Sequence, residues 1–184
     1  NGGTTWDTLT TNAQNGISSI YFSNSQTGIA VGYTGTIIKT TNGGTSWFSI
    51  SSGKTNLLLS VFFADTLTGW TSGAYGTILK TTDKGTNWIS QTSGTISDLS
   101  SIHFTSSQTG WAAGTGGMII NTTDGGISWN TQISGTTNNL FSIHFADSQT
   151  GWAVGNAGTV LKTSDGGTNW IPQESSSTSS FRSV

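Results

Sequence analysis

The chain has 184 residues, of which only 8% are charged, and its formal net charge is −2. So low a charge argues against a nucleic-acid partner, which needs a basic face, and no apolar run approaches the roughly 18 residues of a membrane-spanning helix. The sequence has no cysteine and therefore no disulfide, and we expect no cofactor. Its richness in Ser, Thr and Asn favours an extracellular or cell-surface location.

Tryptophans recur along the chain at a fixed interval. Trp6, Trp47, Trp88, Trp129 and Trp170 follow one another at a spacing of 41 residues. A fixed period of about 40 residues is the signature of a repeat architecture. The chain is therefore expected to repeat one supersecondary unit.

Each unit contains four short apolar segments, which in the first unit are residues 17–23, 28–32, 36–40 and 47–51. The segments are rich in β-branched and aromatic residues and are bounded by Gly, Asn, Ser or Thr, so each is predicted to be a strand. Four strands in about 40 residues are typical of a propeller blade. We predict an all-β fold, a β-propeller of four-stranded antiparallel blades.

The repeat also predicts the division of the single domain, residues 1–184. The blades are assigned to residues 12–52, 53–93, 94–134 and 135–175, with residues 1–11 as the last strand of a preceding blade and residues 176–184 as the start of a further blade. Four complete units with half-units at both ends lead us to expect a fragment of a longer propeller or repeat array. Three arrangements stay open: five blades with one incomplete, about six to eight blades in a longer chain, or strands supplied by another copy, head to tail.

Other positions repeat with the tryptophan. The first strand alternates an aliphatic residue with Phe, as in Ile20 and Phe22, on a face that we place between neighbouring blades. A glycine opens each second strand, where we expect a positive φ. These glycines are Gly28, Gly69, Gly110 and Gly151.

The segment around each periodic tryptophan has the pattern Ser/Thr-x-Asp/Asn-x-Gly-x-x-Trp, as in Thr122-Thr-Asp-Gly-Gly-Ile-Ser-Trp129. This pattern resembles the Asp-box, or BNR repeat. With its surroundings it resembles the repeat of the photosystem II stability/assembly factor family, which is found in many secreted bacterial proteins. The resemblance covers essentially the whole chain. It implies a β-propeller in which the motif forms the turn between the third and fourth strands of a blade.

The residue types of the motif indicate a structural role. The Asp or Asn is placed to accept backbone N–H bonds in a tight turn, the Gly allows the turn geometry, and the Trp closes the outer edge of the blade. One carboxylate per turn is too few for the six to eight oxygens of a Ca²⁺ site, so we expect no metal. The motif residues are Asn42, Gly44, Trp47, Asp83, Gly85, Trp88, Asp124, Gly126, Trp129, Asp165, Gly167 and Trp170.

Asp-box propellers include sialidases and glucan hydrolases, so the resemblance raises the question of catalysis. Sialidase chemistry needs a cluster of arginines, and this chain has one arginine, Arg182. Glucan hydrolysis uses paired carboxylates, but Asp65 and Asp147 occupy equivalent positions and are predicted to be turn residues. We therefore expect no enzymatic activity.

His103 and His144 hold one slot of adjacent first strands, where the other units have Tyr21 and Phe62. First strands line the channel of a propeller, so the two imidazoles can approach each other in a metal or acid–base role. The alternative is that this position has no chemical role and only requires an aromatic ring, and this interpretation fits the sequence better. A slot on the third strand that we expect to be solvated holds Lys39, Lys80 and Lys162.

The turns between second and third strands vary from unit to unit, and ligand contact is expected there. Tyr33, Tyr75 and Asn156 lie in these turns, at the same end of the propeller as the connections between blades. Exposed tyrosines among small polar residues suit a protein or glycan contact, and unconstrained loop tips are the alternative. His103 and His144 complete the set of possible ligand contacts.

Together these features predict a non-catalytic binding or scaffolding module for a protein or glycan partner, or for self-association through the open end strands. One alternative is an assembly factor for a membrane protein complex, although that family docks with an arginine patch and this chain has only Arg182. The other alternative is a fragment of a glycoside hydrolase whose catalytic residues lie outside this segment.

Overall fold

The computed structural model describes residues 4–5, 8, 11 and 13–184. Most of the strand predicted in residues 1–11 lies outside these described residues, Trp6 included. Helix occurs in the described part only as short 3-10 turns, and none of it is long and apolar enough to cross a membrane.

Four antiparallel sheets, each of four strands in chain order, make up the described chain. Blade 1 contains β1 (Ile17–Phe22), β2 (Gly28–Gly32), β3 (Ile37–Thr40) and β4 (Phe48–Ile50). Blade 2 contains β5 (Leu58–Phe63), β6 (Gly69–Gly73), β7 (Ile78–Thr81) and β8 (Ile89–Gln91). Blade 3 contains β9 (Leu99–Phe104), β10 (Gly110–Gly114), β11 (Ile119–Thr122) and β12 (Asn130–Gln132). Blade 4 contains β13 (Leu140–Phe145), β14 (Gly151–Gly155), β15 (Val160–Thr163) and β16 (Ile171–Pro172).

A 3-10 turn joins the second and third strands of each blade. These turns are η1 (Tyr33–Gly35), η2 (Ala74–Gly76), η3 (Thr115–Gly117) and η4 (Asn156–Gly158). The predicted fold class, an all-β propeller of four-stranded antiparallel blades, is therefore confirmed.

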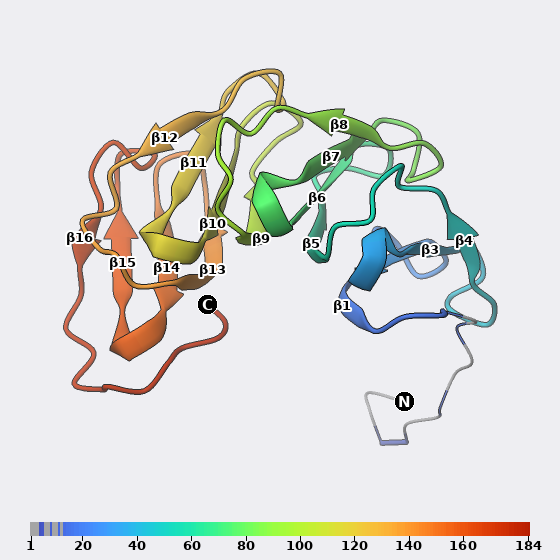
Figure 1. Ribbon diagram of the computed structural model, residues 1–184, viewed down its shortest axis with the longest axis horizontal. Helices are drawn as coiled ribbons and strands as arrows, with labels where there is room; N and C mark the ends of the chain where they lie inside the picture. Colours follow the sequence, from blue (N-terminus) through green and yellow to red (C-terminus); the bar gives the residue numbers. More distant parts are fainter. Residues whose placement is uncertain (1–3, 6–7, 9–10, 12) are drawn as a thin grey trace.

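The four blades follow one another along an arc that is open between blade 4 and blade 1 (Figure 1). The first strands β1, β5, β9 and β13 line its inner side and contact one another in that order. The short fourth strands lie on its outer side. This arrangement places the buried side chains between successive blades.

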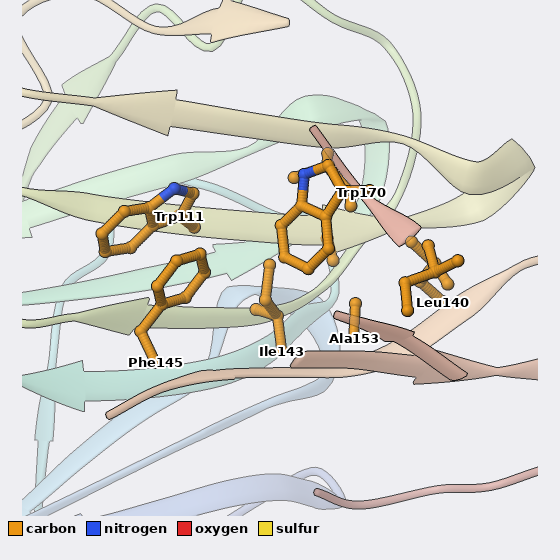
Figure 2. Packing of buried hydrophobic residues seen from close by; sticks show 9 residues of the cluster. Trp111, Leu140, Ile143, Phe145, Ala153 and Trp170 are labelled. Carbon is orange, nitrogen blue, oxygen red and sulfur yellow. The ribbon is translucent and has the colours of Figure 1, made fainter. Parts of the chain in front are cut away.

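The main packing unit between blades is a pair of stacked rings. Trp111 of blade 3 lies parallel to Phe145 of blade 4, with ring centroids 3.5 Å apart (Figure 2). Trp70 and Phe104 stack in the same way between blades 2 and 3, also at 3.5 Å. The aliphatic partner of each Phe is buried beside it, as Ile143 is beside Phe145. Offset and stacked aromatic pairs add to the free energy of simple area burial, so the same pair joins blade 2 to blade 3 and blade 3 to blade 4. Between blades 1 and 2, Ile29 takes the place of the tryptophan and packs in one cluster with Phe63.

The positive φ expected at Gly28, Gly69, Gly110 and Gly151 is wrong, because none of them has one. Each is instead paired across the sheet with the Phe that ends the first strand, as Gly69 is with Phe63. A Cβ atom on Gly69 would lie 2.7 Å from the Phe63 ring. Glycine is required there because the ring lies over its Cα atom, a reason that depends on tertiary structure.

Blade 2 has two hydroxyl groups in its core that form no hydrogen bond with a described residue, those of Thr71 and Ser72. The equivalent positions of blade 3 are Ala112 and Ala113. A buried hydroxyl without a partner destabilises the folded state by roughly 1–3 kcal/mol. We therefore expect Ser72→Ala to raise the free energy of unfolding by about 1 kcal/mol in chemical denaturation.

The matched control for that change is Ser90→Ala. Ser90 is exposed on β8 of the same blade, so this substitution should shift the midpoint of denaturation little. A Ser72→Ala protein less stable than the wild type would show that the Ser72 hydroxyl has a hydrogen-bonding role.

Candidate functional site

The connections of the blades gather at two opposite ends. At the loop-tip end, the 3-10 turns meet the connections between blades; Gly76 N–H donates to the Ser97 carbonyl at 2.9 Å. At the Asp-box end, the turns between third and fourth strands meet those between first and second strands; Gly125 N–H donates to the Gln108 carbonyl at 2.8 Å. These two ends and the inner wall are the three places where functional residues can lie.

In each Asp-box turn, a carboxylate or amide oxygen holds the backbone. Thr81 Oγ1 and Asn87 N–H both donate to Asp83 Oδ1 at 2.9 Å, and Gly85 N–H donates to Thr81 Oγ1 at 3.0 Å. The bond from Asn87 N–H is the main cause that lowers the pKa of Asp83 to about 2. Asp124 and Asp165 accept the same bonds in blades 3 and 4. The donors of the hydrogen bonds given above for these three carboxylates all belong to the same turn as the carboxylate.

Blade 1 shows that the turn does not need a charge. Asn42 Oδ1 accepts from Thr40 Oγ1 and Ser46 N–H at 2.9 Å. Its amide nitrogen donates to Ser46 Oγ at 2.9 Å, where the second carboxylate oxygen of the other turns accepts instead. An amide thus replaces the carboxylate once the facing side chain can accept a hydrogen bond.

The Gly and Trp of each motif contact the strands around them. The motif tryptophans lie edge-on to the Phe of their own first strand; Phe104 and Trp129 have ring centroids 5.9 Å apart and Phe145 and Trp170 5.8 Å apart. Trp47 and Trp170 are buried, and Trp88 and Trp129 are half-buried. Gly44 is also buried. A Cβ atom on Gly85 would lie 2.6 Å from Ile29 of the preceding blade, and Gly126 and Gly167 approach the preceding blade in the same way.

The expectation that the third-strand lysines are solvated is wrong for blades 1 and 2. Lys39 is only 7% exposed, and its Nζ donates to Thr86 Oγ1 of the next blade at 3.0 Å. Lys80 Nζ donates to the Gly125 carbonyl of the next blade at 2.8 Å. Their aliphatic stems lie along the blade face while the ammonium groups bind the next Asp-box turn. These lysines therefore link blades.

The inner wall carries a row of four rings from adjacent first strands: Tyr21, Phe62, His103 and His144. Their successive centroids are 5.4, 4.6 and 4.5 Å apart, so the expected approach of the two imidazoles is confirmed. Burial, followed by the nearby His144, lowers the pKa of His103 to about 4. His103 is therefore neutral at physiological pH.

The hydrogen bond that His103 forms argues against a metal ligand. Its Nδ1 accepts the Phe145 N–H at 3.3 Å, so in the neutral ring the proton is on Nε2. A metal ion bound through Nε2 would require the ring proton to be on Nδ1. The Nδ1–H would then face the Phe145 N–H, and the hydrogen bond between them would be lost. The described residues contain no group of three metal-ligating side chains. The row of rings is thus arranged as packing for the inner wall.

The loop-tip end carries two open concave surfaces. A groove of about 620 Å³ beside η2, here called groove 1, is lined by Lys54, Tyr75, Gln91 and Ile96, among others. Tyr75 and Ile96 are 74% and 87% exposed. Tyr75 has a φ of 55°, and the Asp98 carboxylate accepts its backbone N–H at 2.9 Å. Thr34, Gly116 and Ala157 have the same left-handed conformation in the other three blades, so this φ belongs to the repeated turn.

An equivalent groove of about 640 Å³, groove 2, lies one blade further along beside η3. Its lining includes Met118, Gln132 and Ile133, and Ile133 is also exposed. Grooves 1 and 2 are therefore two copies of one concave site with different side chains.

The other tip residues lie apart from these grooves. Tyr33 is exposed on η1 of blade 1, and Asn156 lies on η4, where its side-chain oxygen accepts from Ser180 Oγ at 3.0 Å. Our sequence interpretation missed Lys54, Ile96 and Ile133, which belong to the connections between blades. Isoleucines within otherwise polar connections are the signal that could have identified two of them.

Comparison with known proteins agrees with this geometry. The family model described as "Photosynthesis system II assembly factor YCF48" matches residues 2–92, 46–135, 89–170 and 129–183. A search of curated proteins finds no match.

Among solved structures, one described as "YCF48 bound to D1 peptide" aligns with a TM-score of 0.74 and 21% identity, over 92% of this chain and 56% of that one. An ancestral GH74 enzyme aligns with a TM-score of 0.70 and 19% identity, over 91% of this chain and 25% of that one. YCF48 from Cyanidioschyzon merolae aligns with a TM-score of 0.61 and 14% identity, over 90% of this chain and 87% of that one. The chain thus spans about half of the first structure and a quarter of the second, and these likenesses show the fold.

The Asp-box turn generates a prediction at Thr122. This residue is fully buried, and its Oγ1 accepts the Gly126 N–H at 2.9 Å and donates to Asp124 at 2.8 Å. Thr122→Val leaves that N–H buried without an acceptor, so we expect the free energy of unfolding to fall by about 1–3 kcal/mol. Thr131→Val on the exposed face of β12 is the control for the change in shape. Equal stability of the two variants would contradict the role assigned to the Thr122 hydroxyl.

The inner wall generates a prediction about pH. The folded-state pKa of His103 is about 4, whereas the ordinary pKa of a histidine is 6.5, so the unfolded chain binds a proton at a higher pH than the folded chain does. The stability that His103 contributes is complete above pH 6.5 and falls as the pH decreases toward 4, by about 1–2 kcal/mol after allowance for solvent screening.

Urea denaturation between about pH 7 and pH 4.5 should show this fall. In His103→Phe, which copies Phe62 of blade 2, the fall over that window should be largely absent. An unchanged pH dependence in the variant would show that other groups cause it.

Proposed function

Because the chain belongs to the family described as Photosynthesis system II assembly factor YCF48, we propose that it is a non-catalytic protein-binding module. The family match spans nearly the whole chain, and a structural neighbour is described as bound to a D1 peptide. The proposal for this chain is that it binds an extended segment of another protein in the grooves of the loop-tip end.

The observation that carries this proposal is the composition of groove 1. Tyr75 and Ile96 expose apolar surface in its lining, which also contains the polar side chains of Lys54 and Gln91. An aromatic or aliphatic anchor beside polar groups is the usual arrangement of a protein-binding site. Groove 2 repeats the site one blade further along, so a peptide that runs along the arc can contact both.

We also propose which class of molecule the partner belongs to. We propose a protein segment as the first candidate, and a segment of a membrane protein under assembly as the form that family membership favours. A glycan is the second candidate, because Tyr75 and the hydroxyl-rich lining of groove 1 also suit a sugar ring. We propose an extracellular or cell-surface location on the basis of the low charge and the Ser/Thr/Asn-rich sequence.

The GH74 likeness keeps the hydrolase fragment as an alternative. The carboxylates of Asp83, Asp124 and Asp165 accept hydrogen bonds within their own turns, and Asp147 accepts the N–H groups of Gln149 and Thr150 at 2.7 Å. A general acid needs a raised pKa, whereas these hydrogen bonds lower the pKa of Asp147. This chemistry supports a non-catalytic function.

The test is a selection of peptides from a random library displayed on phage, with the purified chain as bait. Selected peptides should bind the wild type, and Tyr75→Ser or Ile96→Ser should weaken that binding by about tenfold or more, because each removes an anchor from groove 1. Fluorescence polarisation with the labelled peptides gives the dissociation constants.

The matched control is Ile127→Ser. Ile127 is also highly exposed, but it lies in the Asp-box turn at the opposite end, so the substitution should leave peptide affinity unchanged. Failure to select any peptide, or equal weakening by all three changes, would refute the assignment. A glycan array that binds the wild type and loses binding with Tyr75→Ser would favour the sugar.

A further inference from the structure

A glutamine whose side-chain amide forms two hydrogen bonds joins blade 3 to blade 4. Gln132, the last residue of β12, donates from Nε2 to the Gly166 carbonyl at 3.0 Å. Its Oε1 accepts the indole N–H of Trp170 at 3.2 Å. The second donor to the Gly166 carbonyl is Trp111 Nε1, at 3.0 Å. Blade 4 therefore binds both ends of the Gln132 amide, and the amide nitrogen binds a main-chain carbonyl.

The equivalent glutamine of blade 2, Gln91, is bonded differently although its surroundings repeat. Here the corresponding carbonyl, that of Gly125, accepts an indole N–H and, at 2.8 Å, Lys80 Nζ. The residue of blade 3 that corresponds to Lys80 is Asn121, whose side chain is shorter. Lys80 thus takes the position at the carbonyl that the Gln132 amide takes one blade further along.

Two groups lack a strong partner as a result. The indole N–H of Trp129, which corresponds to that of Trp170, is buried and forms no hydrogen bond with a described residue. Among the described residues, the Gln91 amide nitrogen donates only to the carbonyls of Ile89 and Ser90 in its own strand, at 3.4 and 3.3 Å. These distances exceed those of an ordinary N–H to oxygen bond. Because Gln91 belongs to the lining of groove 1, the groove contains an amide whose weak hydrogen bonds a ligand can replace.

We propose that Gln91 is the residue of groove 1 that recognises the main chain of the bound protein segment, by donating from its amide nitrogen to a backbone carbonyl of that segment. Lys80 is the positioning residue, because it occupies the Gly125 carbonyl and so keeps the Gln91 amide free. This inference rests on the proposed function and deepens it, since it names the chemical group of the partner that groove 1 binds.

The bond between Gln132 and Gly166 shows which ligand group suits the Gln91 amide. There, an amide at the same place on the fourth strand binds a main-chain carbonyl at 3.0 Å. An extended protein segment presents such carbonyls whatever its side chains are. Tyr75 and Ile96 offer apolar contacts for its side chains in the same groove. Groove 2 lacks this function, because both ends of the Gln132 amide are already bound.

The first test measures the affinity of the selected peptides for Gln91→Met by fluorescence polarisation. Methionine keeps the unbranched shape of the side chain but cannot donate a hydrogen bond, so affinity should fall about five- to tenfold. The matched control is Gln149→Met, at an exposed position of the Asp-box end, which should bind as the wild type does. Both variants should melt close to the wild type, whereas Gln132→Met, which removes bonds between blades 3 and 4, should melt at a lower temperature.

The second test asks whether Lys80 keeps the Gln91 amide free. Lys80→Asn copies blade 3, so the Gln91 amide nitrogen should turn to the Gly125 carbonyl and its oxygen should accept the Trp129 indole N–H. The proton resonance of that N–H, assigned by its absence in Trp129→Phe, should move downfield, and peptide affinity should fall about five- to tenfold. In a Gln91→Met background, Lys80→Asn should change neither quantity by a comparable amount.

Different results would contradict this inference and the proposed function. Peptides that lose affinity with Tyr75→Ser but bind Gln91→Met as tightly as the wild type would overturn the role of Gln91 and leave the proposed function intact. An unmoved Trp129 resonance in Lys80→Asn would overturn the role of Lys80 without any peptide present. The absence of any selected peptide would refute the proposed function and this inference with it. A glycan that binds instead, and is weakened by Gln91→Met, would show that the amide recognises a sugar and would contradict a main-chain ligand.

Discussion

The packing of a Phe ring against two indoles, one parallel to it and one edge-on, is the contact on which the rest of the structure depends, and it is formed by Phe104 and Phe145. Phe145 lies parallel to Trp111 of the preceding blade and edge-on to Trp170 of its own Asp-box turn. The three rings belong to the first strand, the second strand and the turn before the fourth strand. Each blade can bury its core only when all of these elements are in register with the next blade. This requirement accounts for the fixed spacing of 41 residues.

The Asp-box turn serves two contacts at once. Its Asp or Asn closes the turn from within, and its central carbonyl accepts donors from the preceding blade, as Gly125 accepts from Trp70 and Lys80. The turn geometry therefore also positions the acceptor between blades. Because the turn needs an acceptor oxygen and no charge, Asn42 can replace the carboxylate in blade 1.

The same packing restricts where a ligand can bind. The rings of the first strands pack against one another along the inner wall, and hydrogen bonds join the turns at the Asp-box end. A groove of about 470 Å³, lined by His103, Ser106 and Asp147 among others, lies there between blades 3 and 4. The loop-tip end differs because its residues vary between units, while its shape is fixed by backbone hydrogen bonds and by bonds from backbone to side chain, such as that from Tyr75 N–H to the Asp98 carboxylate. Tyr75 and Ile96 are exposed there without any packing function. The side chains that line a groove can therefore differ from blade to blade while the packing between blades stays the same.

The sequence by itself determined the fold class, the number of strands in each unit and the position of the Asp-box turns, because periodicity and turn chemistry are local properties. It also placed Tyr75 on an exposed tip and brought His103 near His144, since both follow from the repeat. Only the tertiary structure decided the reason for the glycine opposite Phe63, the bridging role of Lys39 and the tautomer of His103. It also revealed groove 1, whose lining comes from three connections and from strand β8. Each of these depends on which atoms of a neighbouring strand or blade lie within contact distance, and a repeat pattern in one chain does not specify that distance.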